Sequence, residues 1–462
     1  MNFKRDLTGG NTVRQLIMFS IPFLLSNFIQ ALYGVADMII VSWFAGIDSQ
    51  SGVAIGSQVT ILVTNLVLGL GLGGTVMISQ YIGAKKDKDL NETISTLITI
   101  FIIAAAFFTV IMVAFSKPLL LLLNTGKEAM PEATAYVNIC MLGNIFIFGY
   151  NGLSAILRGM GDSNRPLIFV SIACVINVGL DLLFVGVLKL GAAGAAVATI
   201  ISQALSMIFA IIYLVHNKFI FDFKFKSYRI FKDKVKQIFK IGIPTSLQNV
   251  ITVLSFLFLT SLVNGLHPGT ESAASGAAGA VGKFNGFAIL PAIAMSAAIA
   301  AMAGQNIGAK MFKRAENTMF IGMGIAFSFC VIMFIFVQFF PENILMLFNA
   351  DETMMKYGID FLKYVSLDYL IAPLLFSLNG LINGSGHTRV SMVTTILAAL
   401  AVRIPAAYIL GNLYGMAGIG LAVPISTLFA LIVAFIYVRS NKWQKPVVRQ
   451  IEDIIQPIIS ME

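Results

Sequence analysis

Charged residues are scarce in this chain of 462 residues: Asp, Glu, Lys and Arg together make up 11% of it. Soluble globular domains carry about 25%. So few charges cannot cover a surface that faces water, which excludes a soluble globular protein. Apolar residues reach 58%, and mean hydropathy is +0.87. Because the long apolar runs lack the period-two alternation of an outer-membrane barrel, the composition predicts an all-α polytopic membrane protein.

Cysteine and histidine are also rare, with three of each. Cys140, Cys174 and Cys330 lie inside apolar segments and lack the spacing of a disulfide framework or a metal site. We therefore interpret them as small core residues. The sequence contains no Walker motif, so ATP is not expected as a direct energy source. It also lacks a nucleophile–base pair, and we expect neither an enzyme nor a bound cofactor or metal.

What the chain does contain is an internal repeat. The segment QYIGAK at 80–85 returns as QNIGAK at 305–310, a displacement of 305 − 80 = 225 residues. The dipeptide at 21–22, Ile-Pro, returns at 243–244. The chain is therefore two copies of one unit of roughly 220 residues. In a chain this apolar, a duplicated unit is typical of alternating-access transporters.

Breaks between the apolar runs predict twelve membrane-spanning helices, six in each copy. The expected spans are 14–44, 54–82, 92–116, 132–158, 165–187, 191–215, 236–265, 276–308, 314–340, 354–384, 389–411 and 415–438. They define an N-terminal six-helix lobe at 1–215, a linker at 216–237, a C-terminal six-helix lobe at 238–438 and a tail at 439–462. The tail is expected to form either an interfacial helix or a frayed end.

The placement of lysine and arginine predicts the orientation of these spans. With the N-terminus inside, most basic residues fall on the inner side, including those at 85–88, 310–314 and throughout the linker. We therefore expect both termini in the cytoplasm. Since each copy then starts on the same side, the repeats are related by an axis along the membrane normal. The basic, aromatic linker is expected to contact anionic lipid headgroups rather than nucleic acid.

Two carboxylates of the N-terminal lobe are functional candidates, because charge at membrane depth is costly. Asp37 and Asp181 lie at similar depths in their spans. Asn177, four residues before Asp181, shares its helix face. Two carboxylates with an adjacent amide can share protons or coordinate a bare cation. The alternative is that each carboxylate only joins helices by hydrogen bonds.

The C-terminal lobe also has charged residues inside its spans, namely Asp368, Lys283 and Arg403. An internal ion pair is one interpretation, since an unpaired buried charge would be costly. The alternative is that Asp368 lines the substrate path or binds a second ion. Pro22 and Pro244 interrupt spans at matching repeat positions, where they mark either a hinge or a static kink.

The ordered set of motifs resembles the multidrug and toxic compound extrusion (MATE) family over nearly the whole chain. It consists of the two six-span repeats and four local patterns: Pro22, Gln30 and Asp37; Gln80-Tyr-Ile-Gly-Ala-Lys85; Arg158-Gly-Met-Gly-Asp162; Asn177 and Asp181. The resemblance implies two six-helix lobes around a central cavity in the plasma membrane. It also implies export of drugs or other amphipathic, often cationic, compounds in exchange for H⁺ or Na⁺. We expect a monomer in contact with membrane lipids.

The resemblance further implies a cation-coupling site in the N-terminal lobe. Its residues, carried over by position, are Gln30, Asp37, Asn177, Asp181 and Thr199. Tyr136 and Asn151 are the implied substrate-cavity residues, with Asp368 as a further candidate. Thr252 and Ala372 stand where one branch of the family has the acids of a C-lobe Na⁺ site. The chain therefore looks closer to the DinF-like or archaeal-like pattern.

Other functions compete with antiport. A flippase for lipid-linked saccharides or other lipids can share a fold of this type, but it often has a more cationic cavity. Here only Lys283 and Arg403 are candidates for such a role. A channel or a membrane sensor is less compatible, because a two-fold repeat with carboxylates in one half does not form a symmetric pore. The sequence therefore favours a secondary antiporter.

Overall fold

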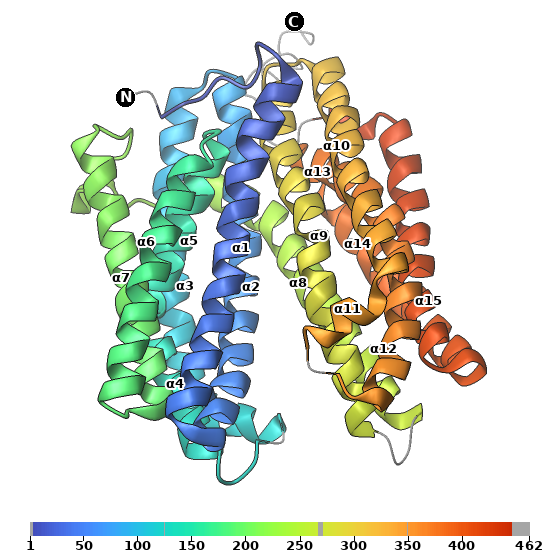
Figure 1. Ribbon diagram of the computed structural model, residues 1–462. Coiled ribbons are helices and arrows are strands. Elements are labelled where there is room, and N and C mark those ends of the chain that lie inside the picture. Colours follow the sequence, from blue (N-terminus) through green and yellow to red (C-terminus); the bar gives the residue numbers. More distant parts are fainter. Residues whose placement is uncertain (1–2, 124, 267–270, 349, 446–462) are drawn as a thin grey trace, which may run out of the picture. The chain divides into compact units, whose positions relative to one another are not determined.

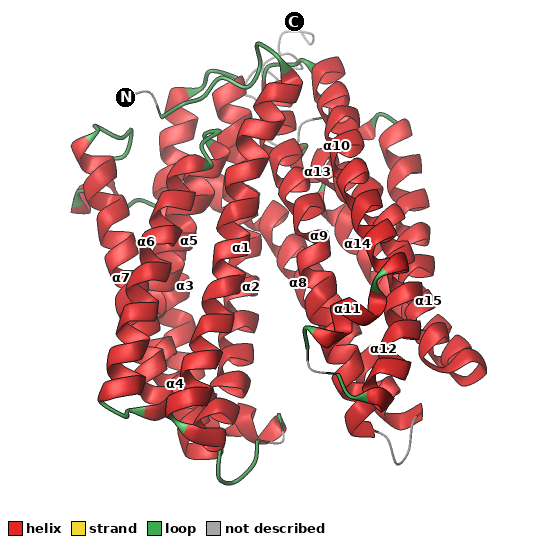
Figure 2. Cartoon of the chain, viewed as in Figure 1, coloured by secondary structure: helices red, strands yellow, loops and turns green. Residues whose placement is uncertain are grey.

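A computed structural model describes residues 3–123, 125–266, 271–348 and 350–445 of the chain. Within these ranges the chain forms helices joined by turns and short connections, without a β-strand (Figure 2). The all-α class predicted from composition is confirmed. The apolar residues of the expected tail helix, Ile451, Ile454, Ile455 and Ile458, lie outside the described residues.

α-Helices of 6 to 38 residues follow one another along the described chain (Figure 1). They are α1 (Thr12–Phe44), α2 (Gly46–Gly83), α3 (Asp87–Leu122), α4 (Met130–Leu142), α5 (Asn144–Gly159), α6 (Asn164–Asp181), α7 (Gly191–His216), α8 (Lys232–Leu266), α9 (Glu271–Gly308), α10 (Phe312–Phe339), α11 (Pro341–Met346), α12 (Glu352–Val365), α13 (Ala372–Gly384), α14 (Thr388–Ile396) and α15 (Ile404–Arg439). The 3₁₀- and π-helical segments are η1 (Leu182–Val187), η2 (Phe225–Ser227), η3 (Ser366–Leu370), η4 (Leu397–Arg403) and η5 (Lys442–Gln444).

The described helices provide twelve membrane spans. Nine helical segments are long and apolar enough to cross a membrane, and two bent helix pairs each form one more. One of the nine, Thr388–Arg439, has 52 residues and is interrupted by Gly415, whose φ of 59° and ψ of −135° are not helical. Dividing that segment at Gly415 gives two spans and a total of twelve, which confirms the number expected from the apolar runs.

The two bent pairs fall where single spans are expected at 132–158 and 354–384. The first bend, of 53°, separates α4 from α5 at Gly143. A Cβ at Gly143 would lie 2.4 Å from the Ile200 side chain, so glycine permits α7 to approach here. The second bend, of 43°, precedes α13, which has Pro373 in its first turn. Proline is tolerated there because its missing N–H has no helical partner at that position.

The outward faces of the helices are apolar. Phe107 and Val110 on α3 are 57% and 71% exposed, and Ile332 on α10 is 64% exposed. Soluble proteins rarely present large contiguous apolar faces to water. These side chains therefore match helices whose outer surfaces contact lipid tails.

Backbone conformation repeats along with the sequence. Four pairs of residues with left-handed φ recur at displacements of 225, 225, 224 and 223: Lys85 and Lys310, Gly161 and Gly386, Gly191 and Gly415, Lys218 and Asn441. Within each pair the two φ angles agree to 5° or better. Left-handed backbone is unfavourable for residues other than glycine. Its recurrence therefore marks equivalent turns in the two copies.

The described helices form two compact units, neither of which is continuous in sequence. Unit 1 contains Ile21–Ile78 and Asp87–Ser246, together with the described residues up to Arg5. Within it, α3 packs against α4 and α5, and α7 packs against α4, α5 and α6. Figure 1 shows α5 and α6 side by side. The first residues of α8 belong to this unit, where the Ser246 hydroxyl donates a hydrogen bond to the Leu66 carbonyl.

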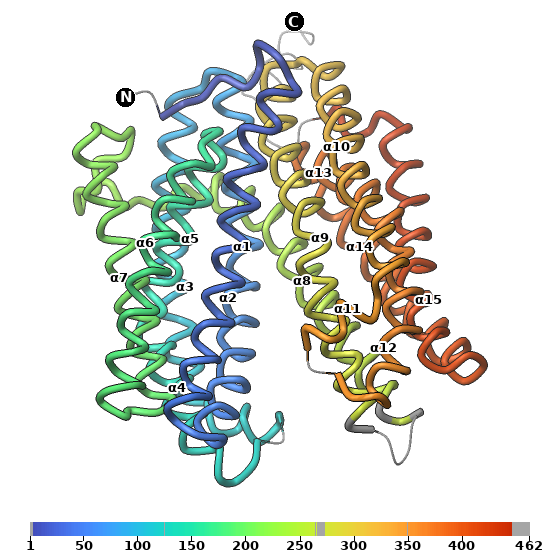
Figure 3. Tube along the Cα trace, in the orientation of Figure 1, coloured from blue at the N-terminus to red at the C-terminus, as the bar shows by residue number. Residues whose placement is uncertain are grey.

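Unit 2 contains Asp6–Ser20, Ser79–Lys86 and the described residues from Leu247 onward. Within it, α9 packs against α10, α12 and α13, and α15 packs against α12 and α13. Although α1 is one continuous helix (Figure 3), its first residues belong to unit 2 and the rest to unit 1. In α8 the first residues, up to Ser246, belong to unit 1 and the rest belong to unit 2. Pro22 and Pro244 each lie within three residues of the position where their helix passes from one unit to the other.

The repeated QxIGAK motif forms a close helix contact inside unit 2. A Cβ at Gly83 would lie 1.9 Å from the carbonyl oxygen of Gln305, and a Cβ at Gly308 would lie 2.1 Å from that of Gln80. Each glycine therefore allows its helix to touch the backbone of the other copy. The Gln80 amide Nε2 also donates to the Gly384 carbonyl over 2.9 Å. The motif thus has a packing role, which only glycine can fill.

The linker between the repeats folds onto unit 1 through aromatic and ionic contacts. Phe219 packs edge-on against Phe3, with ring centroids 5.1 Å apart. Phe221 packs edge-on against Tyr228 at 5.4 Å. Hydrogen bonds from the Ser227 hydroxyl and a backbone N–H lower the pKa of Asp222. The contact of this linker with lipid headgroups stays a prediction.

Lys234 is a buried cation at the start of α8, and its loss has a measurable cost. Its side chain is 3% exposed and pairs with Asp89, with Asp233 at 3.2 Å and with Glu92 at 3.9 Å. We expect Lys234→Met to lower the stability by about 1–3 kcal/mol, because it leaves partly buried carboxylates without a counter-charge. Thermal unfolding measures this effect. Lys236→Met, at an exposed position of the same helix, is the control and should unfold like wild type; an equal loss in both variants would contradict the assignment.

Candidate functional site

Polar side chains lie along one face of α1. Gln30, Tyr33 and Asp37 are separated by three and four residues, a spacing that places them on the same side of a helix. Asp37 is only 4% exposed, and its Oδ1 has no hydrogen-bond partner among the described residues. All three side chains line the same cavity.

A second polar pair lies at the end of α6. Asn177 and Asp181 are one helical turn apart and fully buried. The π-helical segment η1 begins directly after Asp181, and such widened turns are frequent at functional sites. Both carboxylate oxygens of Asp181 and both polar atoms of the Asn177 amide lack a hydrogen-bond partner among the described residues. Since unpaired buried polar groups are costly, these atoms retain capacity to bind a cation or a proton.

Thr199 on α7 is linked to α1 through Tyr33. The Tyr33 hydroxyl donates a hydrogen bond of 2.8 Å to Thr199 Oγ1. The start of α7 is held by Glu132, whose Oε2 accepts a hydrogen bond of 2.8 Å from the Ala192 backbone N–H. A carboxylate at this end of a helix also complements the helix dipole. These contacts set the depth at which Thr199 faces α1.

These helices line a cavity of about 400 Å³ inside unit 1. Of the residues predicted from sequence, the lining includes Gln30, Asp37, Tyr136, Asn151 and Thr199. Asn177 and Asp181 are not part of the lining. The volume lies within the range typical of small-molecule sites. Unit 1 therefore combines a cavity of suitable size with buried carboxylates that have unpaired oxygens.

Several lining residues are absent from the sequence prediction. Tyr33 precedes Asp37 by four residues, and Gln203 follows Thr199 by four, so helical periodicity could have found both. Thr64 on α2 gives no such signal, because its position depends on how α2 packs. Tyr136, by contrast, was implied by the family resemblance; it approaches α2 at Gly56, where a Cβ would lie 2.7 Å from the tyrosine ring.

The ion pair considered for the C-terminal half is not formed. Asp368, Lys283 and Arg403 are all described residues. No carboxylate oxygen of Asp368 lies within 4.0 Å of a side-chain nitrogen of Lys283 or Arg403. Arg403 instead donates hydrogen bonds of 2.9 Å to the hydroxyls of Ser426 and Ser255. Lys283 is exposed. These hydroxyls accept from two of the guanidinium N–H groups, so Arg403 has polar partners without a direct ion pair to Asp368.

Asp368 lies in η3 and is 5% exposed. Its Oδ1 is buried without a hydrogen-bond partner among the described residues. It does not line the cavity of unit 1. A role in substrate passage or in binding a second ion stays a prediction. Over the described ranges, no cluster of three or more His, Cys, Asp or Glu residues could hold a metal ion.

Comparison with known proteins assigns the chain to a family. The MatE family model matches residues 22–183 and 244–409, which cover most of both repeats. The chain therefore belongs to the MatE family, and the resemblance found in the sequence is confirmed.

Individual relatives match over nearly their full lengths. The probable multidrug resistance protein YpnP of Bacillus subtilis is 30% identical, covering 95% of this chain and 97% of that protein. The probable multidrug resistance protein NorM of Thermotoga maritima is 23% identical, covering 94% and 93%. A solved MOP superfamily transporter from Pyrococcus furiosus has a TM-score of 0.87 at 24% identity, covering 94% and 97%. This likeness shows a shared fold.

Proposed function

We propose that the protein exports amphipathic, often cationic, organic compounds from the cell by antiport against H⁺ or Na⁺. Two relatives that match over almost the whole chain are named as probable multidrug resistance proteins. A cavity of about 400 Å³ with a carboxylate in its wall suits an organic cation. The working state is a monomer in the plasma membrane, with both termini in the cytoplasm.

The coupling proposal rests on one observation: Asp37, Asn177 and Asp181 are buried in unit 1 with oxygens that have no partner among the described residues. A proton or Na⁺ that binds there neutralises charge that is otherwise costly to bury. Asp37 also lines the cavity. The coupling cation and a cationic substrate would therefore compete for the same negative charge. Such competition produces antiport when the two ligands favour different conformations.

The proposed coupling site lies only in the first repeat, as in the DinF-like or archaeal-like pattern. Thr252 and Ala372 stand at the positions of the acids in the branch with a C-lobe Na⁺ site. The Thr252 hydroxyl donates to the Gln248 carbonyl over 2.8 Å and offers no negative charge. Bending of α1 near Pro22 is the proposed conformational step, because proline weakens the helix where α1 passes from one compact unit to the other.

The proposal is tested with purified protein in proteoliposomes loaded with ethidium, a fluorescent organic cation. Efflux is measured with a pH gradient alone, a Na⁺ gradient alone, both and neither. We expect an inwardly directed gradient of the coupling cation to accelerate ethidium efflux above the rate measured without an ion gradient. Protein-dependent efflux at a rate that neither ion gradient changes would point to a channel. Movement of a fluorescent phospholipid without ethidium efflux would point to a flippase, and either result would overturn the proposal.

A further inference from the structure

Unit 2 contains a second cavity, of about 440 Å³, at the position in the second repeat that corresponds to the first cavity. Residues that line the two cavities pair up when the two copies of the repeat are aligned. Asp37, Asn151 and Thr199 line the first cavity, whereas Leu259, Phe376 and Val423 line the second. The displacements of these pairs are 259 − 37 = 222, 376 − 151 = 225 and 423 − 199 = 224. The two cavities are therefore the same architectural feature with different walls.

The wall of the second cavity carries no charge. No Asp, Glu, Lys, Arg or His is among the described residues that line it. Its hydroxyl groups are bonded within their own helix: Thr252 donates to the Gln248 carbonyl over 2.8 Å, and Thr260 donates to the Phe256 carbonyl over 3.1 Å. An organic cation would be less favourable in this cavity than in the first, because no carboxylate in the wall balances its charge.

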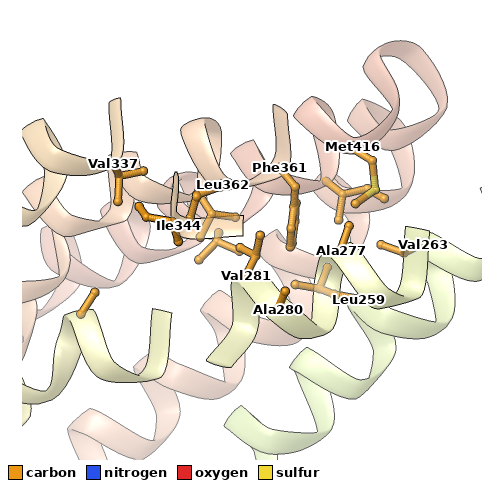
Figure 4. Packing of buried hydrophobic residues seen from close by; sticks show 14 of the residues in the cluster. Leu259, Val263, Ala277, Ala280, Val281, Val337, Ile344, Phe361, Leu362 and Met416 are labelled. Atoms are coloured by element: carbon orange, nitrogen blue, oxygen red, sulfur yellow. The ribbon is translucent and has the colours of Figure 1, made fainter. Parts of the chain in front are cut away.

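Aromatic rings and a bare helix face form much of this wall. Phe256, Phe361 and Phe376 line the cavity, and Figure 4 shows Phe361 pointing toward Leu259. On α9, Gly279, Gly282 and Gly286 lie on one face, and a Cβ at any of them would meet nothing within 4 Å. The missing side chains leave room for a flat ligand between α9 and the rings. Ring stacking and apolar burial would stabilise an aromatic group there.

One polar group in this wall is unused. Asn285 lines the cavity and is 8% exposed, and its Oδ1 has no hydrogen-bond partner among the described residues. At the repeat displacement of 222 its counterpart is Val63, so this acceptor belongs to the second repeat alone. A buried carbonyl oxygen without a donor is costly, and a ligand N–H or O–H would remove that cost.

We infer that the second cavity binds an uncharged aromatic portion of a small molecule, which donates one hydrogen bond to Asn285 Oδ1. The two repeats then offer two chemically different sites, with carboxylate in the first and a neutral aromatic wall with a single acceptor in the second. The volume is sufficient for two aromatic rings. This binding needs no ion gradient, so it does not depend on the proposed antiport.

The test uses 4-(hydroxymethyl)benzophenone, an uncharged two-ring ketone with one hydroxyl donor that attaches to nearby C–H bonds under near-ultraviolet light. The full chain is labelled in lipid nanodiscs without a gradient, and the labelled peptides are mapped by mass spectrometry. We expect saturable labelling of the cavity wall on α8, α9 or α12. The apparent affinity should be about tenfold higher than that of 4-methylbenzophenone, which lacks the donor. Labelling that does not saturate, or that maps elsewhere, would overturn the inference.

Two substitutions separate the site from general partitioning into lipid. Gly286→Leu places a side chain in open cavity space and should reduce saturable labelling at least about tenfold. Gly324→Leu, at an exposed position of α10 that lines neither cavity, is the matched control and should label like wild type. Asn285→Leu should remove the difference between the two benzophenones. An unchanged Gly286→Leu variant, or an equal loss in Gly324→Leu, would contradict the assignment. If Gly286→Leu does not fold, Asn285→Leu and the peptide map decide.

Discussion

Asp37→Asn is expected to reduce gradient-driven ethidium efflux to the rate of protein-free liposomes while the protein still folds. Asparagine nearly matches aspartate in shape, but it has no charge and cannot take up a proton. The substitution therefore removes the cavity-lining carboxylate that the proposed coupling requires. Folding should be maintained, because Asp37 Oδ1 makes no hydrogen bond among the described residues that the substitution could break. Ethidium fluorescence under each gradient measures the loss.

The matched control for this substitution is Asp48→Asn. Asp48 is exposed in the first turn of α2, so its replacement should leave efflux at the wild-type rate. Asp181→Asn should reproduce the Asp37→Asn defect, since both carboxylates belong to the proposed site. Asp368→Asn tests whether a second coupling group exists in the other repeat. Undiminished efflux in Asp37→Asn would rule out coupling through the first repeat.

Gly83→Ala should be the most destabilising of the small substitutions considered. The added Cβ would lie 1.9 Å from the Gln305 carbonyl oxygen, a backbone atom that cannot move aside by rotating a side chain. We expect a loss of about 3 kcal/mol or failure to accumulate in the membrane, because the two helices must separate. Thermal unfolding followed by tryptophan fluorescence measures this loss. Trp443 is buried in unit 2 and packs edge-on against Phe312, with ring centroids 6.3 Å apart. Its fluorescence therefore reports on the affected unit.

Gly324→Ala on α10 provides the control. A Cβ there meets nothing within 4 Å, and alanine favours helix relative to glycine by about 1 kcal/mol. This variant should be as stable as wild type or slightly more stable. The difference between the two substitutions isolates the contact between the repeated motifs. If Gly83→Ala unfolds at the same temperature as Gly324→Ala, the close crossing at Gln305 is not important for stability.

Local patterns in the sequence are sufficient to predict much of this architecture. A bilayer requires about 20 consecutive apolar residues for each helix, so span number is a property of composition along the chain. The repeat is likewise a property of sequence, and left-handed turns such as Lys85 and Lys310 confirm it in the backbone. Helical period also places Asn177 beside Asp181, because residues four apart share a face. The sequence alone therefore predicted the all-α membrane class, the number of spans and the similarity between the two repeats.

Tertiary structure decided which side chains meet. Tyr33 bonds to Thr199 across 166 residues, and no local rule relates the depths of α1 and α7. Arg403 finds serine hydroxyls instead of Asp368, because its partners are set by packing rather than by charge alone. The second cavity likewise depends on how α8, α9 and α12 pack around three glycines. Membrane insertion selects each helix by its own apolar residues, whereas sites form from the few polar groups that packing brings together.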